Sequence, residues 1–526
     1  MSAPRHASPL ALLLAFALLL VAGGAIRAQE TLEQDCSPQA RPHLDHGFVV
    51  LHAFQNEWAR RDFLTASAID PECAMAYCGE ALSFYRALGP PATAEQLLLG
   101  AEAIGRARKA KKAYERDRRF IEVAGLLFTR HETSTRSSRD LAFHNAIQLL
   151  HTSFPRDVEI AAYHGLVFLA IDAGSGSTTL EWKKKAAAVL GPYSGSRHVG
   201  VLNYLVHALD STHESAKRAL PIAEQLSAIA ADIPGARHAP AHVYLRLGRW
   251  AEGLAAARAA DLASLELLRR LDLPAEHRDL HNAEMLLHAY LQAGRVGEAG
   301  ALLAEIETIA KESESEAALE TYAAMRYRYF LEGRQWTEAV KAVPLFDGRE
   351  EQIRVSHAKA IAAWHLGRTG LLRAGVDGLR DFGVKLPERR AAEALLALAY
   401  GDPTRAANEL GEAAATEGAV ALPPLLPMPP IPASELYGEI LLQLGHPSRA
   451  EDHFEDVLRV RPNRPTALLG LARCAAALGR KEEAGATLAA VLEIWQGADA
   501  DFAPLAEALN LVAPAEPPPR TAAAAP

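Results

Sequence analysis

Two stretches near the end of the chain repeat one pattern at a distance of 34 residues. Residues 445–458 read GHPSRAEDHFEDVL, and residues 479–492 read GRKEEAGATLAAVL. The matched positions are Gly445 and Gly479, Ala450 and Ala484, Phe454 and Leu488, and Leu458 and Leu492. Small and apolar residues at a fixed interval of this size predict a stack of helix pairs, because one pair cannot bury its apolar face alone.

The interval and its offsets resemble the tetratricopeptide repeat (TPR), a helix–turn–helix unit. The same offsets recur at Gly47, Ala59, Phe63, Ala66 and Pro71, and Gly438 and Pro462 complete the first C-terminal copy. Looser copies are marked by Gly248 with Trp250, by Gly294 with Ala299, and by Gly333 with Trp336 and Ala339. We therefore expect an all-α, TPR-like α-α superhelix (solenoid) of about 11–13 helix pairs. Such a fold defines a shape and not a reaction.

The N-terminal residues have the plan of a secretory signal peptide. Arg5 and His6 precede an unbroken apolar run, Leu10–Ile26, and small residues permit cleavage after Ala25 or Ala28. An uncleaved anchor is the alternative, but the run is short for a span of about 20 residues. We expect cleavage, a periplasmic or secreted protein, and membrane contact only during export.

Composition limits the classes of function. Of the 526 residues, 49% are hydrophobic, which is enough for a large helical core, and β-branched runs are scarce. The net charge is −9 and no basic stripe is present, so nucleic-acid binding is not expected.

The cysteines indicate one possible disulfide. Cys73 and Cys78 are five residues apart on one predicted helix and point to different faces, so they are poor partners for each other. A Cys36–Cys73 bridge would suit an oxidising compartment and would contribute about 3–4 kcal/mol. In the alternative interpretation all four cysteines are small buried apolar residues, and this is how we interpret Cys474.

The chain divides into segments by composition. We expect a signal peptide over residues 1–28, an irregular helical solenoid over 29–421, a proline-rich extended segment over 422–432, a TPR pair with a closing helix over 433–512, and a disordered tail over 513–526. The apolar residues of the proline-rich segment suggest that it packs along the solenoid. A proline-rich ligand for another domain is the alternative.

Several phrases resemble a group of largely uncharacterised exported bacterial TPR proteins. They are residues 36–38 (CSP), 51–54 (LHAF), 70–77 (DPECAMAY), 204–208 (YLVHA), 238–242 (HAPAH) and 435–439 (ELYGE). The chain differs at Asn203 and Gly235, where relatives often carry additional histidines. The resemblance implies the fold and export, and it implies no established activity.

Histidines supply the one chemically suggestive pattern. The TPR register, counted back from Gly248 and Gly294, predicts a shared patch in the concave groove. The predicted groove residues are His238, His242, Arg246, His281, Glu284, His288 and Tyr327. Histidines four residues apart on one helix face could also bind a divalent metal, for which His207, His238, His242 and His288 are the candidate ligands.

Two functions follow from this pattern. The favoured one is an exported TPR scaffold that binds a protein or peptide partner through its concave groove and needs no cofactor. The alternative is a metal-binding protein or metal-dependent hydrolase that uses the groove histidines. No phosphate loop, nucleophile elbow or His-Glu-x-x-His motif is present, so no catalytic residue can be assigned, and we expect binding rather than catalysis.

Overall fold

The computed structural model describes residues 35–89, 91–130, 132–175, 179–313, 315–418, 426 and 429–512. The predicted signal peptide, the predicted tail and most of the proline-rich segment lie outside these residues. The described residues form helices joined by turns, and an isolated bridge pairs Cys73 with Lys112. The predicted all-α, TPR-like solenoid is confirmed.

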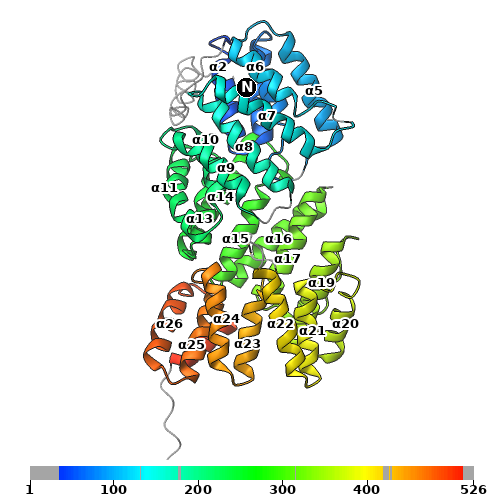
Figure 1. Ribbon diagram of the computed structural model, residues 1–526, viewed down its shortest axis with the longest axis vertical. Helices are drawn as coiled ribbons and strands as arrows, with labels where there is room; N and C mark the ends of the chain where they lie inside the picture. The colour runs from blue at the N-terminus through cyan, green and yellow to red at the C-terminus, as the bar shows by residue number, and fades with distance from the viewer. Residues whose placement is uncertain are drawn as a thin grey trace, which may run out of the picture. The chain divides into compact units, whose positions relative to one another are not determined.

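The described residues gather into two compact units. Unit 1 comprises the residues up to Asp210, together with Glu214–Val243 and Leu262–Leu267. Unit 2 comprises Ser211–His213, Tyr244–Asp261 and the residues from Leu268 onward. Each unit has its own succession of helices, drawn in Figure 1.

Unit 1 is built from helices α2 to α12 and most of the short helix α13. Their bounds are α2 (Arg41–His52), α3 (Asn56–Ile69), α4 (Ala74–Leu82), α5 (Ala94–Lys109), α6 (Glu115–Gly125), α7 (Arg136–Ser153), α8 (Val158–Ser175), α9 (Glu181–Leu190), α10 (Val199–Leu209), α11 (His213–Ile229), α12 (Pro234–Arg237) and α13 (Ala239–Arg246). Helix α8 has the length and apolar content of a membrane span, and 67% of it is buried inside the protein. It packs against α7, α9 and α10, so its apolar composition suits a helix that is covered on several sides.

Unit 2 contains the later helix pairs. The bounds are α14 (Trp250–Leu271, which also contributes to unit 1), α15 (Leu280–Gln292), α16 (Val296–Glu312), α17 (Glu316–Glu332), α18 (Trp336–Ala339), α19 (Arg349–His365), α20 (Thr369–Asp377), α21 (Pro387–Ala399), α22 (Pro403–Gly418), α23 (Ala433–Gln443), α24 (Pro447–Val460), α25 (Pro465–Ala477), α26 (Lys481–Ile494) and α27 (Ala503–Val512). Helices α19 to α26 lie side by side in chain order (Figure 1). One continuous apolar cluster runs from Tyr327 on α17 to Cys474 on α25.

A phenylalanine wedged between two glycines joins successive helix pairs. In unit 2, a Cβ at Gly438 or at Gly470 would lie 2.9 Å or 2.4 Å from the ring of Phe454. Phe63 has the same relation to Gly47 and Gly79 in unit 1. Both rings are fully buried. The glycines are therefore needed so that a large ring can fill the space between three helices at native packing density.

The turns inside the helix pairs of unit 2 need a left-handed residue. Glycine holds this position at Gly248, Gly294, Gly367, Gly401, Gly445 and Gly479, where φ lies between 65° and 80°. In the turn between α17 and α18 the position belongs to Arg334, with φ of 54°, whereas the preceding Gly333 has φ of −79°. Arg334 stands two residues before Trp336, as Gly248 stands before Trp250. An L-residue in this conformation costs about 1–2 kcal/mol.

The last helix pairs of unit 2 return to the turns near its beginning. The indole Nε1 of Trp250 donates to the carbonyl of Asn463 at 2.7 Å, and that of Trp495 donates to the carbonyl of Gln292 at 3.0 Å. The amide of Asp499 donates to the carbonyl of Gly294 at 3.0 Å. These bonds join residues about 200 positions apart, so the interior of unit 2 is lined by both early and late repeats.

The cysteines are arranged as the favoured interpretation expects. A disulfide joins Cys36 to Cys73, with their Cα atoms 4.9 Å apart, and ties the first described residues to the start of α4. Cys78 and Cys474 are free and buried. Burial raises the pKa of the Cys474 thiol to about 12, which fits the role of a small apolar core residue.

The described part of the proline-rich segment packs on unit 2. Leu426 is 8% exposed, and the carbonyl of Pro430 accepts a hydrogen bond of 2.9 Å from Nη2 of Arg464. Arg464 is itself buried, so this carbonyl satisfies part of the guanidinium.

Candidate functional sites

The predicted groove residues are mostly buried. His238 and His242 belong to unit 1, and the other five belong to unit 2. Five of the seven are only 3–6% exposed: His238, His242, Arg246, His288 and Tyr327. His281 is exposed and Glu284 is half-buried. Five of the seven predicted groove residues are therefore covered in the structure, and a binding groove formed by all seven stays a prediction.

The histidines of unit 1 pack ring against ring. The ring of His242 lies 5.1 Å from that of His207 and 5.3 Å from that of His238. Nδ1 of His242 donates to Oδ2 of Asp210 at 3.1 Å. This hydrogen bond links His242 on α13 to Asp210 at the end of α10. A metal site that uses these residues stays a prediction.

His288, the fourth predicted metal ligand, belongs to an ion network of unit 2. Its Nδ1 donates to Oε2 of Glu332 at 2.9 Å, and Arg328 and Arg464 also contact this carboxylate, at 3.1 Å and 3.5 Å. Burial would raise the pKa of Glu332, but His288 and the two arginines lower it to about 2. Burial lowers the pKa of His288 to about 4. The network satisfies a buried carboxylate with cationic and neutral donors.

Tyr327, also predicted to line the groove, has a partner of its own. Its hydroxyl lies 2.7 Å from Nδ1 of His357, and both residues are buried. Burial lowers the pKa of His357 to about 3, so its ring is neutral and Nδ1 can accept a hydrogen bond from the tyrosine hydroxyl. This pair is part of the core of unit 2.

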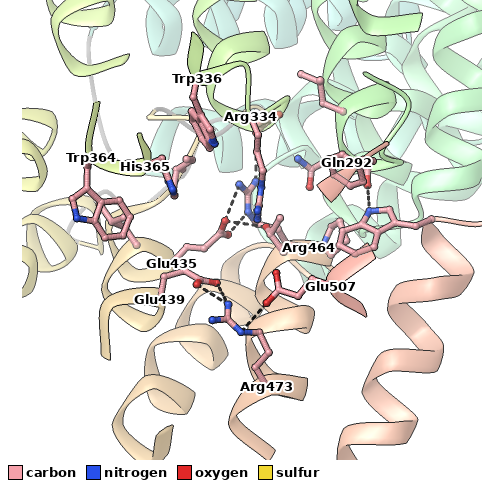
Figure 2. A pocket seen from close by; sticks show the side chains of 18 of the residues that line it. Gln292, Arg334, Trp336, Trp364, His365, Glu435, Glu439, Arg464, Arg473 and Glu507 are labelled. Carbon is pink, nitrogen blue, oxygen red and sulfur yellow. Dashed lines mark hydrogen bonds and ion pairs between the residues drawn. The ribbon is translucent and has the colours of Figure 1, made fainter. Parts of the chain in front are cut away.

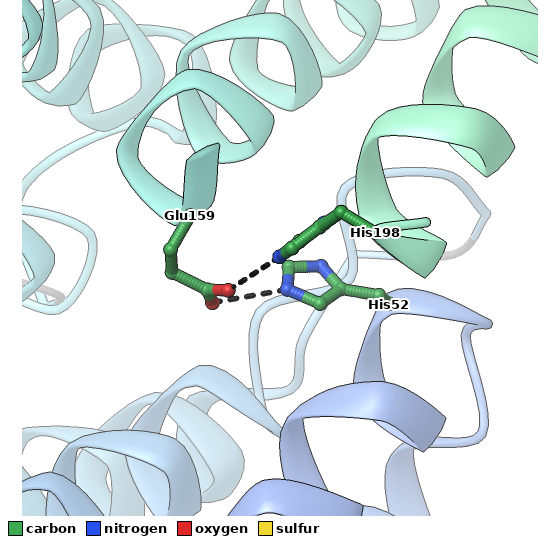
Figure 3. A group of neighbouring side chains, drawn as sticks. All are labelled: His52, Glu159 and His198. Atoms are coloured by element: carbon green, nitrogen blue, oxygen red, sulfur yellow. Dashed lines mark hydrogen bonds and ion pairs between the residues drawn. The ribbon is translucent and has the colours of Figure 1, made fainter. Parts of the chain in front are cut away.

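A group that the sequence did not reveal lies in unit 1, where His52, Glu159 and His198 meet (Figure 3). Nε2 of His52 lies 3.0 Å from Oε1 of Glu159, and Nε2 of His198 lies 2.8 Å from Oε2. All three side chains are buried, and one potential ligand atom from each lies within 4.8 Å of the others. Burial would raise the pKa of Glu159, but the two histidines hold it well below its usual range.

The hydrogen bonds of this group favour a structural network over a metal centre. Nδ1 of His198 caps α10 by accepting the backbone N–H of Val201 at 3.3 Å. A neutral imidazole that accepts at Nδ1 carries its proton on Nε2, and that nitrogen then donates to Glu159 and offers no lone pair to an ion. The ring of His52 is held at its other nitrogen by the Tyr204 hydroxyl, at 2.8 Å. The donor set as arranged therefore does not fit a metal ion.

Asn203 and Gly235 pack around this network. Asn203 donates from Nδ2 to the carbonyl of His52 at 2.8 Å. A Cβ at Gly235 would lie 1.9 Å from the carbonyl oxygen of Ala53, and a Cβ at Gly200 would lie 2.6 Å from the ring of His52. The backbone around His52 thus excludes a side chain at position 235.

One cavity of unit 2 has a volume of about 260 Å³ and is lined by aromatic and charged side chains (Figure 2). Its walls include Trp336, Trp364, His365, Trp495 and Phe502. The rings of Trp336 and His365 stack at 4.3 Å with an interplanar angle of 10°. The contributing segments run from α15 to α27, so the cavity depends on the return of the last helix pairs to the early ones.

Most charged groups of this cavity have partners. Arg464 pairs with Glu435, which also accepts from Thr466 at 2.9 Å. Arg473 lies between Glu439 and Glu507, at 2.7 Å and 3.1 Å, as the dashed lines of Figure 2 show. Two carboxylates therefore share one guanidinium.

Two polar side chains of the cavity have no partner among the described residues. Among the described residues, the guanidinium of Arg334 forms no ion pair within 4 Å, and Glu439, Glu507 and Glu435 attract it at longer range. Oε1 of Gln292 is buried without a hydrogen bond, and this residue is only 3% exposed. Burial lowers the pKa of Arg334, and the negative charge of Glu439 opposes this shift most strongly. Figure 2 shows Arg334 reaching into the cavity from its turn.

Comparison with known proteins identifies the C-terminal repeats. Residues 438–499 match the family model of the tetratricopeptide repeat. This segment is similar to the tetratricopeptide repeat. No curated protein sequence matches the chain.

Solved structures resemble the chain over most of its length but at low similarity. Yeast Tom70 covers 90% of this chain and 95% of its own, at 12% identity and a TM-score of 0.35. A chain of the APC/C hetero-tetramer Cut9-Hcn1 covers 90% of this chain and 96% of its own, at 13% identity and a TM-score of 0.29.

Proposed function

We propose that the protein is an exported scaffold that binds a protein partner through the turn edge of its last TPR repeats. The observation that carries this proposal is a row of exposed apolar side chains, Tyr400, Leu444 and Leu478, which we call the turn-edge row. They are 56%, 43% and 41% exposed. Large exposed apolar residues that recur at one position on neighbouring repeats are typical of a protein-binding surface.

The position of these three residues within their turns supports the proposal. Each member stands immediately before a left-handed glycine, at Gly401, Gly445 or Gly479. The equivalent residues before Gly248 and Gly294, Leu247 and Ala293, are both 8% exposed. The same position is thus buried in the turns at Gly248 and Gly294 and exposed in the last three, where much of each apolar side chain stays in contact with water. The partner therefore contacts the turn edge rather than the buried histidines.

Export is the second part of the proposal. It rests on the predicted signal peptide over residues 1–28 and on the disulfide between Cys36 and Cys73. Disulfides of this kind persist in oxidising compartments. Cell fractionation combined with thiol labelling before and after reduction tests this part. The exported protein should show two protected sulfurs that become labelled only after reduction, and a cytosolic protein with free thiols would overturn it.

A photo-crosslinking amino acid placed at position 444 tests the binding surface in living cells. We expect a discrete adduct with one protein partner. The matched control carries the crosslinker at Glu455, an exposed polar position on α24. Changing Leu444 and Leu478 to Asp should weaken binding of the identified partner about tenfold or more, because each buried leucine contributes about 1.5–3 kcal/mol. Equal adducts at positions 444 and 455, or undiminished binding by the double variant, would refute the proposal.

A further inference from the structure

We propose that the cavity of unit 2 binds a free amino acid with a large apolar side chain, held as its zwitterion between Arg334 and Glu439. This site is separate from the turn-edge row and does not depend on the proposed scaffold function. The cavity is about 260 Å³, which is near the lower end of ligand sites and suits one small molecule rather than a peptide segment.

The first step of the argument concerns the conformation of Arg334. Six other turns of unit 2 place glycine in the left-handed position, and Arg334 occupies it in the turn before α18. A strained residue of this kind is retained where the surrounding structure has a use for its side chain. The guanidinium makes no ion pair with the residues that the structure describes, although it lies within the charged cavity. A planar guanidinium without a partner is suited to binding a carboxylate in two places at once.

The second step concerns the acidic side of the cavity. Glu439 and Glu507 share Arg473 as their common partner, so the two carboxylates have a single ion-pair partner between them. Burial raises the pKa of Glu439, and Arg473 and Arg334 oppose this shift. Arg334 influences Glu439 but is more than 4 Å from it. A ligand with a carboxylate at one end and an ammonium close by would neutralise both groups.

The third step concerns the uncharged walls. Trp364 and the stacked pair of Trp336 and His365 present flat aromatic surface to the cavity, and this surface suits an apolar or aromatic side chain. Oε1 of Gln292 is buried, lines the cavity and has no donor among the described residues. An unpaired acceptor in this position is costly unless a ligand donates to it. A hydrogen-bond donor of the ligand would satisfy Oε1 of Gln292.

Isothermal titration of the full exported chain with three probes tests the assignment. L-phenylalanine carries both charges, 3-phenylpropionate lacks the ammonium, and 2-phenylethylamine lacks the carboxylate. We expect saturable binding of L-phenylalanine and at least tenfold weaker binding of either analogue. If L-phenylalanine does not bind, the same titration with L-tryptophan, L-leucine and L-methionine covers the remaining sizes, and failure of all four overturns the proposal. Equal binding of 3-phenylpropionate and L-phenylalanine also overturns it.

The variant Arg334→Gly gives a sharp test because it restores the residue that the other turns use. We expect at least a tenfold loss of L-phenylalanine binding, with a melting temperature equal to or above that of the unchanged protein. Arg405→Ala, which removes an exposed arginine from α22, is the matched control and should bind normally. Undiminished binding by Arg334→Gly would refute the site. Crosslinking from position 444 should be unaffected, so the two proposals can fail independently.

Discussion

One substitution, glycine to alanine, should have opposite effects at two neighbouring helices of the C-terminal repeats. Gly470 lies in α25 and Gly485 lies in α26, and both are inside their helices. At Gly485 an added Cβ meets nothing within 4 Å, so alanine should stabilise by about 0.8–1 kcal/mol through helix propensity. At Gly470 the Cβ would lie 2.4 Å from two atoms of the Phe454 ring.

The ring of Phe454 has little room to move away. It is fully buried, and a Cβ at Gly438 would lie 2.9 Å from it, so the neighbouring helix holds the ring on a second side. Overpacking of this kind costs about 1–3 kcal/mol. The Cβ at position 470 would lie about 1 Å closer to the ring than van der Waals contact allows, so we use the upper end of this cost. After the helix gain is subtracted, Gly470→Ala should destabilise by about 2 kcal/mol, and the two variants should differ by about 3 kcal/mol.

Native-state hydrogen exchange of the full chain is the suitable assay. A chain with two compact units does not unfold in one step, so a single denaturation midpoint would mix several events. Exchange of amides in α23–α26 reports the local opening free energy directly. Adding Phe454→Leu to Gly470→Ala should recover about 1–2 kcal/mol relative to the sum of the single changes, since the smaller side chain vacates the space. Shifts of the same sign in the two glycine variants, or no coupling with position 454, would contradict the proposed packing.

Three further predictions concern pH, the disulfide and the buried network. Burial lowers the pKa of His288 to about 4 and of His357 to about 3, whereas an unfolded histidine titrates near 6.5. The unfolded state therefore binds more protons as the pH falls, and each histidine should remove about 1.5 kcal/mol from unit 2 between pH 6.5 and 5. Native-state hydrogen exchange of unit 2 amides at each pH measures this loss, and stability that rises over this range would contradict the burial. Cys36→Ser opens a loop with a sequence separation of 37 and should cost about 4 kcal/mol, seen as an equal loss when the unchanged protein is reduced. Glu159→Gln should cost about 1–3 kcal/mol in thermal unfolding because it leaves a buried histidine donor without an acceptor, while Glu122→Gln, in an exposed ion pair, should cost less than about 1 kcal/mol.

The sequence predicts features that depend on neighbours along the chain. The 34-residue register locates the helix pairs, the Gly445 and Gly479 turns, and Phe454 as a core residue, because each follows from contacts within or between adjacent repeats. The Cys36–Cys73 disulfide can also be predicted from the sequence, because only one helix pair separates the two residues. These features need no knowledge of distant contacts.

The sequence does not predict features that depend on contacts between distant repeats. His52 and Glu159 are 107 residues apart and meet only when α2 packs near α8 and α10. The cavity of unit 2 requires Trp495 to reach Gln292, 203 residues away. The register also placed His288 and Tyr327 on the polar face of their helices, but it cannot show what covers that face. Periodicity identifies a helix face, and tertiary packing decides whether the face is open.

Gly235 and Arg334 show how a departure from pattern can be assigned to structure or to function. At Gly235 a Cβ would lie 1.9 Å from the carbonyl oxygen of Ala53, so glycine is the residue that the fold itself requires. At Arg334 the left-handed backbone favours glycine, and arginine costs about 1–2 kcal/mol there. A substitution scan should therefore accept only glycine at position 235, and at position 334 it should gain stability with glycine or asparagine. In the proposed site, the reason for arginine at position 334 is that its guanidinium binds the carboxylate of the ligand.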